Sequence, residues 1–423
     1  MTDRSTPPPV NELLTGAMPP ETVEVLSNGL TFHRFSGGDQ PVCRLRILFC
    51  GGQAETGNKL ISKVMLSALA EGTQTIPTET FADLLDYNGV RIGSDSHSHY
   101  SSLTIAMLNH RATSVTPLIA SMLAEPLFPQ ERIDTMLRNV KAQLEIADTE
   151  VSTLAEYASD ALTMGKNHPL AQRLTPSDID AITRDDIISL HRRMIVPARA
   201  HAYLSGLLDE TTIDAVRTLL GGIKATGPGF DIKIVPNEPE PPGRVDVYGA
   251  DTLQSAIAAT LPAVSRSHPD YNDLRLTVMA LGGYFGSRLM SNIREEKGMT
   301  YGISAYPSGA HEGSYITIAA TCDKQYTDDV LREISLEMTR LADDPPCADE
   351  LSRLKRHALT SLAQTLDSPT SISGYYITSL LVGTPPDYFA AQQQAIKALT
   401  AERISYLANE YLDPTKLRIA VAS

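Results

Sequence analysis

The sequence IDAITRDDIISLHRRMIVPARAHAYL occupies residues 179–204, and IKALTAERISYLANEYLDPTKLRIAV occupies residues 396–421. At a constant offset of 217 residues, the two stretches place the same residue types in the same order. Each contains a threonine, apolar residues at helical spacing, a proline and then an alternating pattern typical of a strand. The shared order predicts one structural unit that occurs twice.

The ends of the repeated helix are marked in both copies. Thr183 and Thr400 can each accept hydrogen bonds from the free amide groups of a first helical turn. Asp186 lies three residues after Thr183 and gives the first copy an acidic variant of the capping box. Pro197 and Pro414 stand where the helical pattern stops, because proline cannot continue a helix. Cap, apolar stripe, proline and strand are rarely shared together by chance.

This duplication predicts an α+β protein made of two homologous halves of about 200 residues, each an antiparallel-rich sheet covered by helices. Residues 221–244, GGIKATGPGFDIKIVPNEPEPPGR, are rich in Gly, Pro and Glu, as expected of an exposed linker. We therefore expect a flexible N-terminal segment at 1–21 and a first domain at 22–220. The linker at 221–244 and a second domain at 245–423 follow.

Local patterns predict the main elements of each half. In the first half we expect a strand at 43–50, a helix at 60–71, strands within 91–108 and mostly helix over 113–147. In the second half we expect helices at 272–281 and 287–297, then a hairpin formed by 300–306 and 314–321.

The composition excludes several functional classes. The 423 residues include 36 basic and 50 acidic side chains, a net charge of −14, which argues against binding to phosphate-rich nucleic acid. The start, MTDRSTPPPV, lacks the apolar core of a secretory signal. No apolar stretch approaches the roughly 18 residues that a membrane span needs. We therefore expect a cytoplasmic protein without nucleic-acid or membrane partners.

The four cysteines are Cys43, Cys50, Cys322 and Cys347. They show neither CxxC spacing nor the density of a disulfide framework. We expect them to be buried thiols in a reducing cytosol.

The most distinctive local segment is GGYFGSRLMSNIREEKGMTYGISA at residues 282–305. Ser287 could cap a helix, and Gly298 could end it in the left-handed conformation that glycine adopts at low cost. Thr300 and Tyr301 would then open a strand. The glycines do not form a phosphate-binding loop, because they follow a helix and no Gly-Lys-Ser/Thr is present.

This segment resembles the second-half signature of the pitrilysin, insulin-degrading and mitochondrial-processing peptidases. That signature is a glycine pair, a Ser-Arg-Leu helix, an Ile-Arg-Glu run and then Gly-x-x-Tyr. The resemblance extends from about residue 22 to the end of the chain and includes the duplicated halves. It implies that Arg294 holds the substrate backbone and that the Tyr301 hydroxyl stabilises the oxyanion. Helix-dipole and strand preferences alone would also explain these two residues.

The first half departs from that family at its metal site. Active members carry His-x-x-Glu-His on one helix, where two histidines bind zinc and the glutamate activates water. Counting back from the Gly-Thr pair at 72–73 puts Lys63, Leu66 and Ser67 in these positions. Lysine repels a cation, leucine cannot accept a proton, and a serine hydroxyl is a poor zinc ligand. We therefore expect no zinc in this chain.

The third ligand of the family is a glutamate further along the chain. Counting forward puts Gln143 near its place, with Glu145 close by. No His-x-x-Glu-His or His-Glu-x-x-His occurs elsewhere in the sequence.

A second candidate metal site involves two histidines in a predicted strand. His97 and His99 flank Ser98, so both would project to the same face of the strand, where Asp95 could join them. We do not favour a metal here, because the sequence suggests no further ligand.

Two functions follow from the resemblance. In the first, the chain is a zinc-free subunit that forms a heterodimer with a zinc-motif homologue, which holds the zinc and hydrolyses peptides. Arg294 and Tyr301 would then complete the partner's site. In the second, the chain is a non-catalytic peptide-binding or scaffold protein. An active enzyme that uses another site has no support in the sequence. The sequence does not decide whether the isolated chain forms homodimers.

Overall fold

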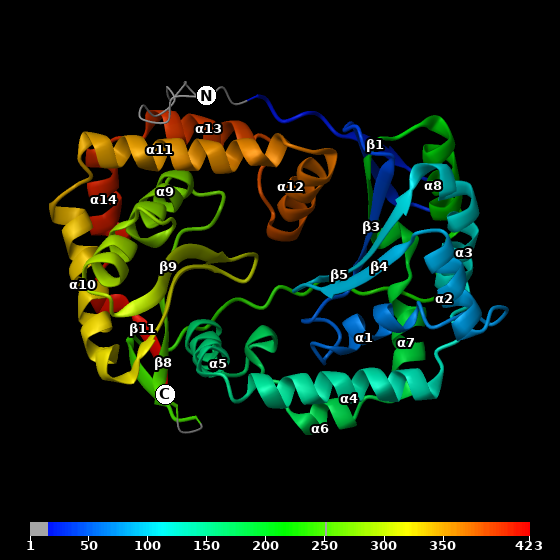
Figure 1. Ribbon diagram of the computed structural model, residues 1–423, viewed down its shortest axis with the longest axis horizontal. Helices are drawn as coiled ribbons and strands as arrows, with labels where there is room; N and C mark the ends of the chain where they lie inside the picture. The colour runs from blue at the N-terminus through cyan, green and yellow to red at the C-terminus, as the bar shows by residue number, and fades with distance from the viewer. Residues whose placement is uncertain (1–15, 250–251) are drawn as a thin grey trace, which may run out of the picture.

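The computed structural model describes residues 16–249 and 252–423, which form two sheets with helices packed around them (Figure 1). The first sheet has the strand order β1-β2-β6-β3-β5-β4. Its strands are β1 (Thr22–Val25), β2 (Thr31–Ser36), β3 (Val42–Cys50), β4 (Arg91–Ser96), β5 (Tyr100–Leu108) and β6 (Ala200–Gly206). The second sheet has the order β7-β11-β8-β10-β9. Its strands are β7 (Gly243–Val247), β8 (Gln254–Pro262), β9 (Thr300–Gly309), β10 (Ser314–Asp323) and β11 (Arg418–Ala422).

The two sheets have the same topology. Strand β2 pairs in parallel with β6, and β7 pairs in parallel with β11. The neighbouring pairs, from β6-β3-β5-β4 and from β11-β8-β10-β9, are all antiparallel. The short strand β1 extends only the first sheet. The predicted α+β fold with two like halves is therefore confirmed.

Helices surround both sheets. The first half contains α1 (Ile61–Ala68), α2 (Thr78–Tyr87), α3 (Ala112–Ala124), α4 (Gln130–Ala147), α5 (Val151–Met164), α6 (Pro176–Asp180), α7 (Arg184–Met194) and α8 (Glu210–Gly222). The second half contains α9 (Tyr271–Gly282), the π-helix η4 (Met290–Glu296), α10 (Thr327–Asp343), α11 (Ala348–Ala363), α12 (Pro369–Val382), α13 (Tyr388–Ala398) and α14 (Ala401–Tyr411).

The sequence repeat corresponds to a repeated structural unit. Helix α7 begins after Thr183, whose hydroxyl accepts from the Asp186 amide, and the Asp186 carboxylate accepts from the Thr183 amide. Helix α14 begins after Thr400, whose hydroxyl accepts from the Arg403 amide. In both copies a proline then starts a 3₁₀ turn that leads into a strand, β6 or β11.

The halves exchange one helix each. Helix α5 belongs to the first half in sequence, yet it packs on β8 and β11 through Leu154 and Ala155. Helix α12 belongs to the second half, yet it packs on β2 and β6 through Ile377. Each half thus places one helix on the sheet of the other half, so the sheets do not divide the chain at one point. The domain bounds 22–220 and 245–423 remain predictions. Residues 1–15 of the expected N-terminal segment lie outside the described residues.

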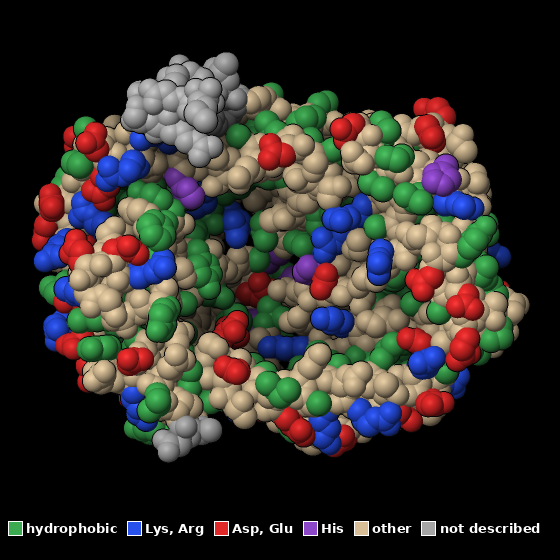
Figure 2. All heavy atoms as spheres, in the orientation of Figure 1, with side chains coloured by type: hydrophobic (Ala, Val, Ile, Leu, Met, Phe, Trp, Pro, Cys, Tyr) green, Lys and Arg blue, Asp and Glu red, His purple; other side chains and the backbone are tan. Residues whose placement is uncertain are grey.

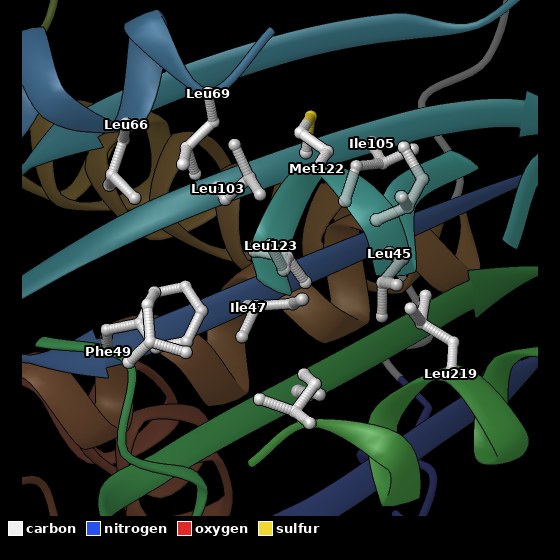
Figure 3. Packing of buried hydrophobic residues seen from close by; sticks show 14 of the residues in the cluster. Leu45, Ile47, Phe49, Leu66, Leu69, Leu103, Ile105, Met122, Leu123 and Leu219 are labelled. Atoms are coloured by element: carbon white, nitrogen blue, oxygen red, sulfur yellow. The ribbon is translucent and has the colours of Figure 1, made fainter. Parts of the chain in front are cut away.

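The cores follow from the alternating strand pattern. One face of the first sheet packs against α1, α3, α7 and α8, and Figure 3 shows leucine, isoleucine and phenylalanine side chains of these layers in contact. The linker contributes Phe230, which is 2 % exposed, so the segment 221–244 is not an exposed linker along its whole length. Burying an aromatic side chain of this kind fixes the path of the chain between the halves.

The cysteines differ in part from expectation. Cys43, Cys50 and Cys322 are buried free thiols, as predicted, but Cys347 is exposed because it immediately precedes α11 at the surface. No helix within 16–249 or 252–423 is both long and apolar enough to cross a membrane.

Candidate functional site

Helix α1 carries the three positions where active peptidases of the resembled family bind zinc. Lys63 is exposed, Leu66 is fully buried and Ser67 is half-buried. Figure 3 shows Leu66 pointing from α1 into the hydrophobic core, alongside Leu69 and Leu103. The position that would need a catalytic glutamate therefore faces the core of the first half.

Serine hydroxyls attach α1 to the edge strand β4. The Ser67 and Ser94 hydroxyls are 2.7 Å apart, and those of Ser62 and Ser96 are 2.8 Å apart. Each pair satisfies its own hydrogen bonds, so Ser67 is used in packing rather than in ligation.

The further ligand positions fit a metal no better. Gln143 and Glu145 both lie exposed on α4. Within the described parts of the chain, no group of three His, Cys, Asp or Glu side chains is arranged to hold a metal ion. A zinc ion does not fit the residues at 63, 66 and 67, which are lysine, leucine and serine.

The prediction that His97 and His99 lie on a strand is wrong. Both belong to the turn between β4 and β5, where a period-two pattern no longer decides which way side chains point. His97 Nε2 is 3.2 Å from Arg46 Nη2, whereas the two ring nitrogens of His99 face Glu55 and Glu312. The two imidazoles therefore have different partners and do not form the considered metal site.

Arg294 lies in the π-helix η4, where hydrogen bonds run from residue i to residue i+5, as from the Lys297 amide to the Asn292 carbonyl at 3.1 Å. The Arg294 side chain is 38 % exposed and its guanidinium lies 5.3 Å from the centre of the Phe285 ring. Single π-helical turns are rare and occur frequently at functional sites. The sequence predicted an ordinary helix here.

Buried carboxylates of α10 hold η4 in place. The Asn292 amide donates to Glu333 Oε2 at 3.0 Å and to Glu337 Oε1 at 2.7 Å. Both carboxylates are buried, and Lys297 and Arg340 pair with them. The hydrogen bond from Lys297 outweighs burial and lowers the pKa of Glu333. Sequence analysis missed this pair, although two glutamates interrupt the apolar stripe Val330–Ile334–Met338 of α10.

Tyr301 occupies a β-bulge at the start of β9. Thr300 pairs with Cys322 and Gly302 pairs with Thr321, so Tyr301 between them has no partner on β10. The Thr300 hydroxyl lies 2.9 Å from the Gly302 carbonyl oxygen and 2.5 Å from that of Thr321. A bulge of this kind redirects a side chain, and Tyr301 is 87 % exposed.

The turn between η4 and β9 agrees only in part with the sequence. Gly298 has φ +63°, the left-handed conformation predicted for it, and its amide donates to the Arg294 carbonyl. Ser287 does not cap the helix: its buried hydroxyl has no hydrogen-bond partner among the described residues. The Ser287 carbonyl still accepts from the Ser291 amide at 2.9 Å, so the chain becomes helical directly after Ser287 without a side-chain cap.

A cavity of about 490 Å³ lies between α5 and the inner face of strands β8, β9 and β10. Gly302, next to Tyr301, lines it together with Tyr306 and two carboxylates of α5, Glu156 and Asp160. Burial, with the charge of Glu156, raises the pKa of Asp160 to about 6. On the side of the molecule drawn in Figure 2, a hollow lies near the middle, with basic, acidic and histidine side chains around it.

Another cavity lies away from these residues. It measures about 990 Å³ and lies between α3 and α8, where threonine and apolar side chains line it. None of the predicted site residues borders it.

Comparisons with known proteins agree with this architecture. Residues 181–357, a range that contains Arg294 and Tyr301, match the family model described as the peptidase M16 inactive domain. This part of the chain is similar to the M16 peptidases, and residues 63, 66 and 67 do not form their zinc motif. The chain is 22 % identical over 301 residues to an uncharacterised zinc protease of Streptomyces coelicolor. It is 24 % identical over 262 residues to a non-peptidase homologue, YmxG, of Helicobacter pylori.

The alignments cover 69 % and 60 % of this chain, and 62 % and 59 % of those two relatives. Solved structures extend the likeness in fold. An M16 inactive domain from Pseudomonas fluorescens superposes with a TM-score of 0.83 at 20 % identity, covering 95 % of this chain and 98 % of the other. A protease from Helicobacter pylori gives 0.82 at 16 % identity, covering 96 % and 100 %. At these identities the likeness establishes the fold alone.

Proposed function

We propose that this chain is the zinc-free subunit of an M16-type peptidase pair. It would bind a peptide together with a zinc-carrying homologue and supply Arg294 and Tyr301 to the reaction. The observation that carries the proposal is a contrast between the two halves. Tyr301 is held out by a bulge and is 87 % exposed, whereas Leu66 fills a zinc-motif position with a buried apolar side chain.

Each residue suits a distinct role. The Tyr301 hydroxyl can donate a hydrogen bond to the oxyanion that forms when a peptide carbonyl is attacked. The Arg294 guanidinium offers several donors in a fixed plane, which suits the carbonyl groups of an extended peptide. The metal-bound water that attacks the carbonyl would come from the partner.

The cavity beside β9 supports a peptide as the ligand. Gly302, which follows Tyr301, lines this cavity. A peptide bound past Tyr301 would therefore enter the cavity and contact the hydroxyl and alanine side chains of the sheet. The expected cytoplasmic location stays part of this proposal, and so does the heterodimer.

A non-catalytic scaffold is the second candidate. It is favoured by the Helicobacter pylori relative, which is named a non-peptidase homologue. In that case Arg294 and Tyr301 would have no effect on any peptidase activity.

The two candidates separate on one substitution. We would mix the purified chain with a zinc-motif homologue from the same genome and compare Tyr301→Phe with Tyr248→Phe. Tyr248 is a matched control, because it is another tyrosine of the second half and is 80 % exposed. Loss of a preorganised donor should lower kcat of the mixture by roughly 100- to 1000-fold, with assembly unchanged. Equal activity of both variants would contradict the proposed role of Tyr301.

A further inference from the structure

The two halves meet at a buried histidine that lies between two carboxylates. His99 Nδ1 is 2.6 Å from Glu55 Oε1, and its Nε2 is 2.5 Å from Glu312 Oε1. The side chains of His99, Glu55 and Glu312 are 4 %, 5 % and 7 % exposed. Glu55 and His99 belong to the first half, whereas Glu312 lies at the tip of the β9–β10 hairpin of the second half.

This geometry requires a charged imidazole. A neutral histidine has one donor nitrogen and one acceptor nitrogen, so one of the two carboxylates would face another acceptor. Only the imidazolium donates to both. Burial opposes the charge, but the hydrogen bonds to Glu312 and Glu55 outweigh it and raise the pKa of His99 to about 9. Charge-assisted hydrogen bonds are stronger than neutral ones.

Other groups around His99 come from several elements. The His311 ring on the hairpin lies 6.2 Å from the His99 ring, and Cys50 and Tyr100 of the first sheet lie near Glu55. His97 of the same turn contacts Arg46 instead. The linker also participates, because the Asn237 amide donates to the Glu312 carbonyl at 2.9 Å.

We propose that Glu55, His99 and Glu312 form an ionic latch that holds the β9–β10 hairpin against the first half and keeps the two halves closed. Opening would separate Glu312 from His99. Glu55 would stay in the first half, because the Gly52 amide donates to Glu55 Oε2 at 3.0 Å. The latch goes beyond the proposed function, because it acts in this chain alone. It would also control the position of β9, the strand that carries Tyr301 in the bulge at its start.

A latch of this type has a defined pH dependence. The pKa of His99 is raised in the folded state, so its stabilising contribution is complete below the unfolded pKa of about 6.5 and is lost as pH rises through about 9. The closed state should therefore persist at neutral pH and loosen in alkali.

Hydrogen–deuterium exchange and small-angle X-ray scattering on the full chain test this at pH 7.5. Glu312→Gln keeps an acceptor but removes the charge, and we expect exchange at residues 97–99 and 309–313 to become roughly tenfold faster. The radius of gyration should increase as well. The control is Glu350→Gln, which removes a carboxylate that pairs with Arg288 within the second half. Exchange no faster than in this control, or an unchanged radius, would overturn the latch.

The wild-type protein gives a second test that does not depend on the folding of a variant. After correction for intrinsic rates, protection at 309–313 should fall between pH 8 and pH 10, while protection of buried β10 stays constant. Parallel behaviour of the two segments over this range would also overturn the latch.

Discussion

The two halves share a topology, and in each a helix lies beside the edge strand of the sheet, α1 beside β4 and η4 beside β9, but the two helices are held by different means. In the first half, α1 is fixed by the fully buried Leu66 and by serine hydroxyl pairs with β4. In the second half, η4 is fixed by Asn292, whose amide reaches two buried carboxylates of α10. In the first half, apolar packing and neutral hydroxyl pairs therefore do for α1 what buried carboxylates do for η4.

The difference separates the requirements of the fold from those of a site. Buried ionic groups contribute little net stability, since the cost of removing them from water offsets most of their attraction. The polar attachment of η4 instead holds a rare π-helical turn in one conformation, and Arg294 lies in that turn. The zinc-motif helix has become part of the core, while η4 and β9 keep exposed polar side chains.

The largest effect should come from placing a charge in the α1 core. Leu66→Glu restores the glutamate of the zinc motif, yet it would bury a carboxylate among Leu69, Leu103 and their neighbours. We expect a loss of about 4 kcal/mol or more in the free energy of unfolding, measured with urea.

The matched control is Lys63→Glu, one helical turn away on the exposed side of α1, which should change stability by less than about 0.5 kcal/mol. Similar stabilities for the two variants would mean that residue 66 can turn away from the core, and that the zinc-motif position is not committed to packing.

A smaller loss should follow from removing the attachment of η4. Asn292→Ala leaves Glu333 and Glu337 without their amide donor, which should cost about 1–3 kcal/mol. Asn409→Ala, an exposed residue of α14, provides the control in the same urea titration. If both variants are equally stable, the buried carboxylates do not fix η4, and the comparison of the halves loses its physical basis.

The smallest effect should distinguish the two repeated helices. Thr183 takes part in a reciprocal capping box, whereas Thr400 accepts only one hydrogen bond, from Arg403. Thr183→Ala and Thr400→Ala should each cost about 1 kcal/mol, with the larger loss for Thr183. Thermal denaturation of the two variants measures this, and a larger loss at Thr400 would contradict the stronger capping of α7.

Features that depend on neighbours in sequence could be predicted. The caps at Thr183 and Thr400, the left-handed Gly298 and the β9–β10 hairpin each require only a few adjacent residues. The repeat then predicted two like halves, because the same local signals occur twice. The departures at Lys63, Leu66 and Ser67 followed from the resemblance and a count of positions.

Features that depend on contacts across the molecule could not be predicted. The exchange of α5 and α12 is decided by which sheet face is left open, which no local pattern records. The bulge at Tyr301 depends on the register of β10, and one partner of the His99 ring, Glu312, lies 213 residues away. Each of these decides the direction of a side chain, so candidate residues were found more readily than their geometry.

The most direct test of the central claim is the metal content and peptidase activity of the purified chain, alone and mixed with a zinc-motif homologue from the same genome. The account predicts a chain that is free of zinc and inert alone, and that raises the activity of the mixture. Inactivity in every mixture would contradict the subunit role and favour a scaffold. Stoichiometric zinc together with peptide cleavage by the chain alone would contradict the account as a whole.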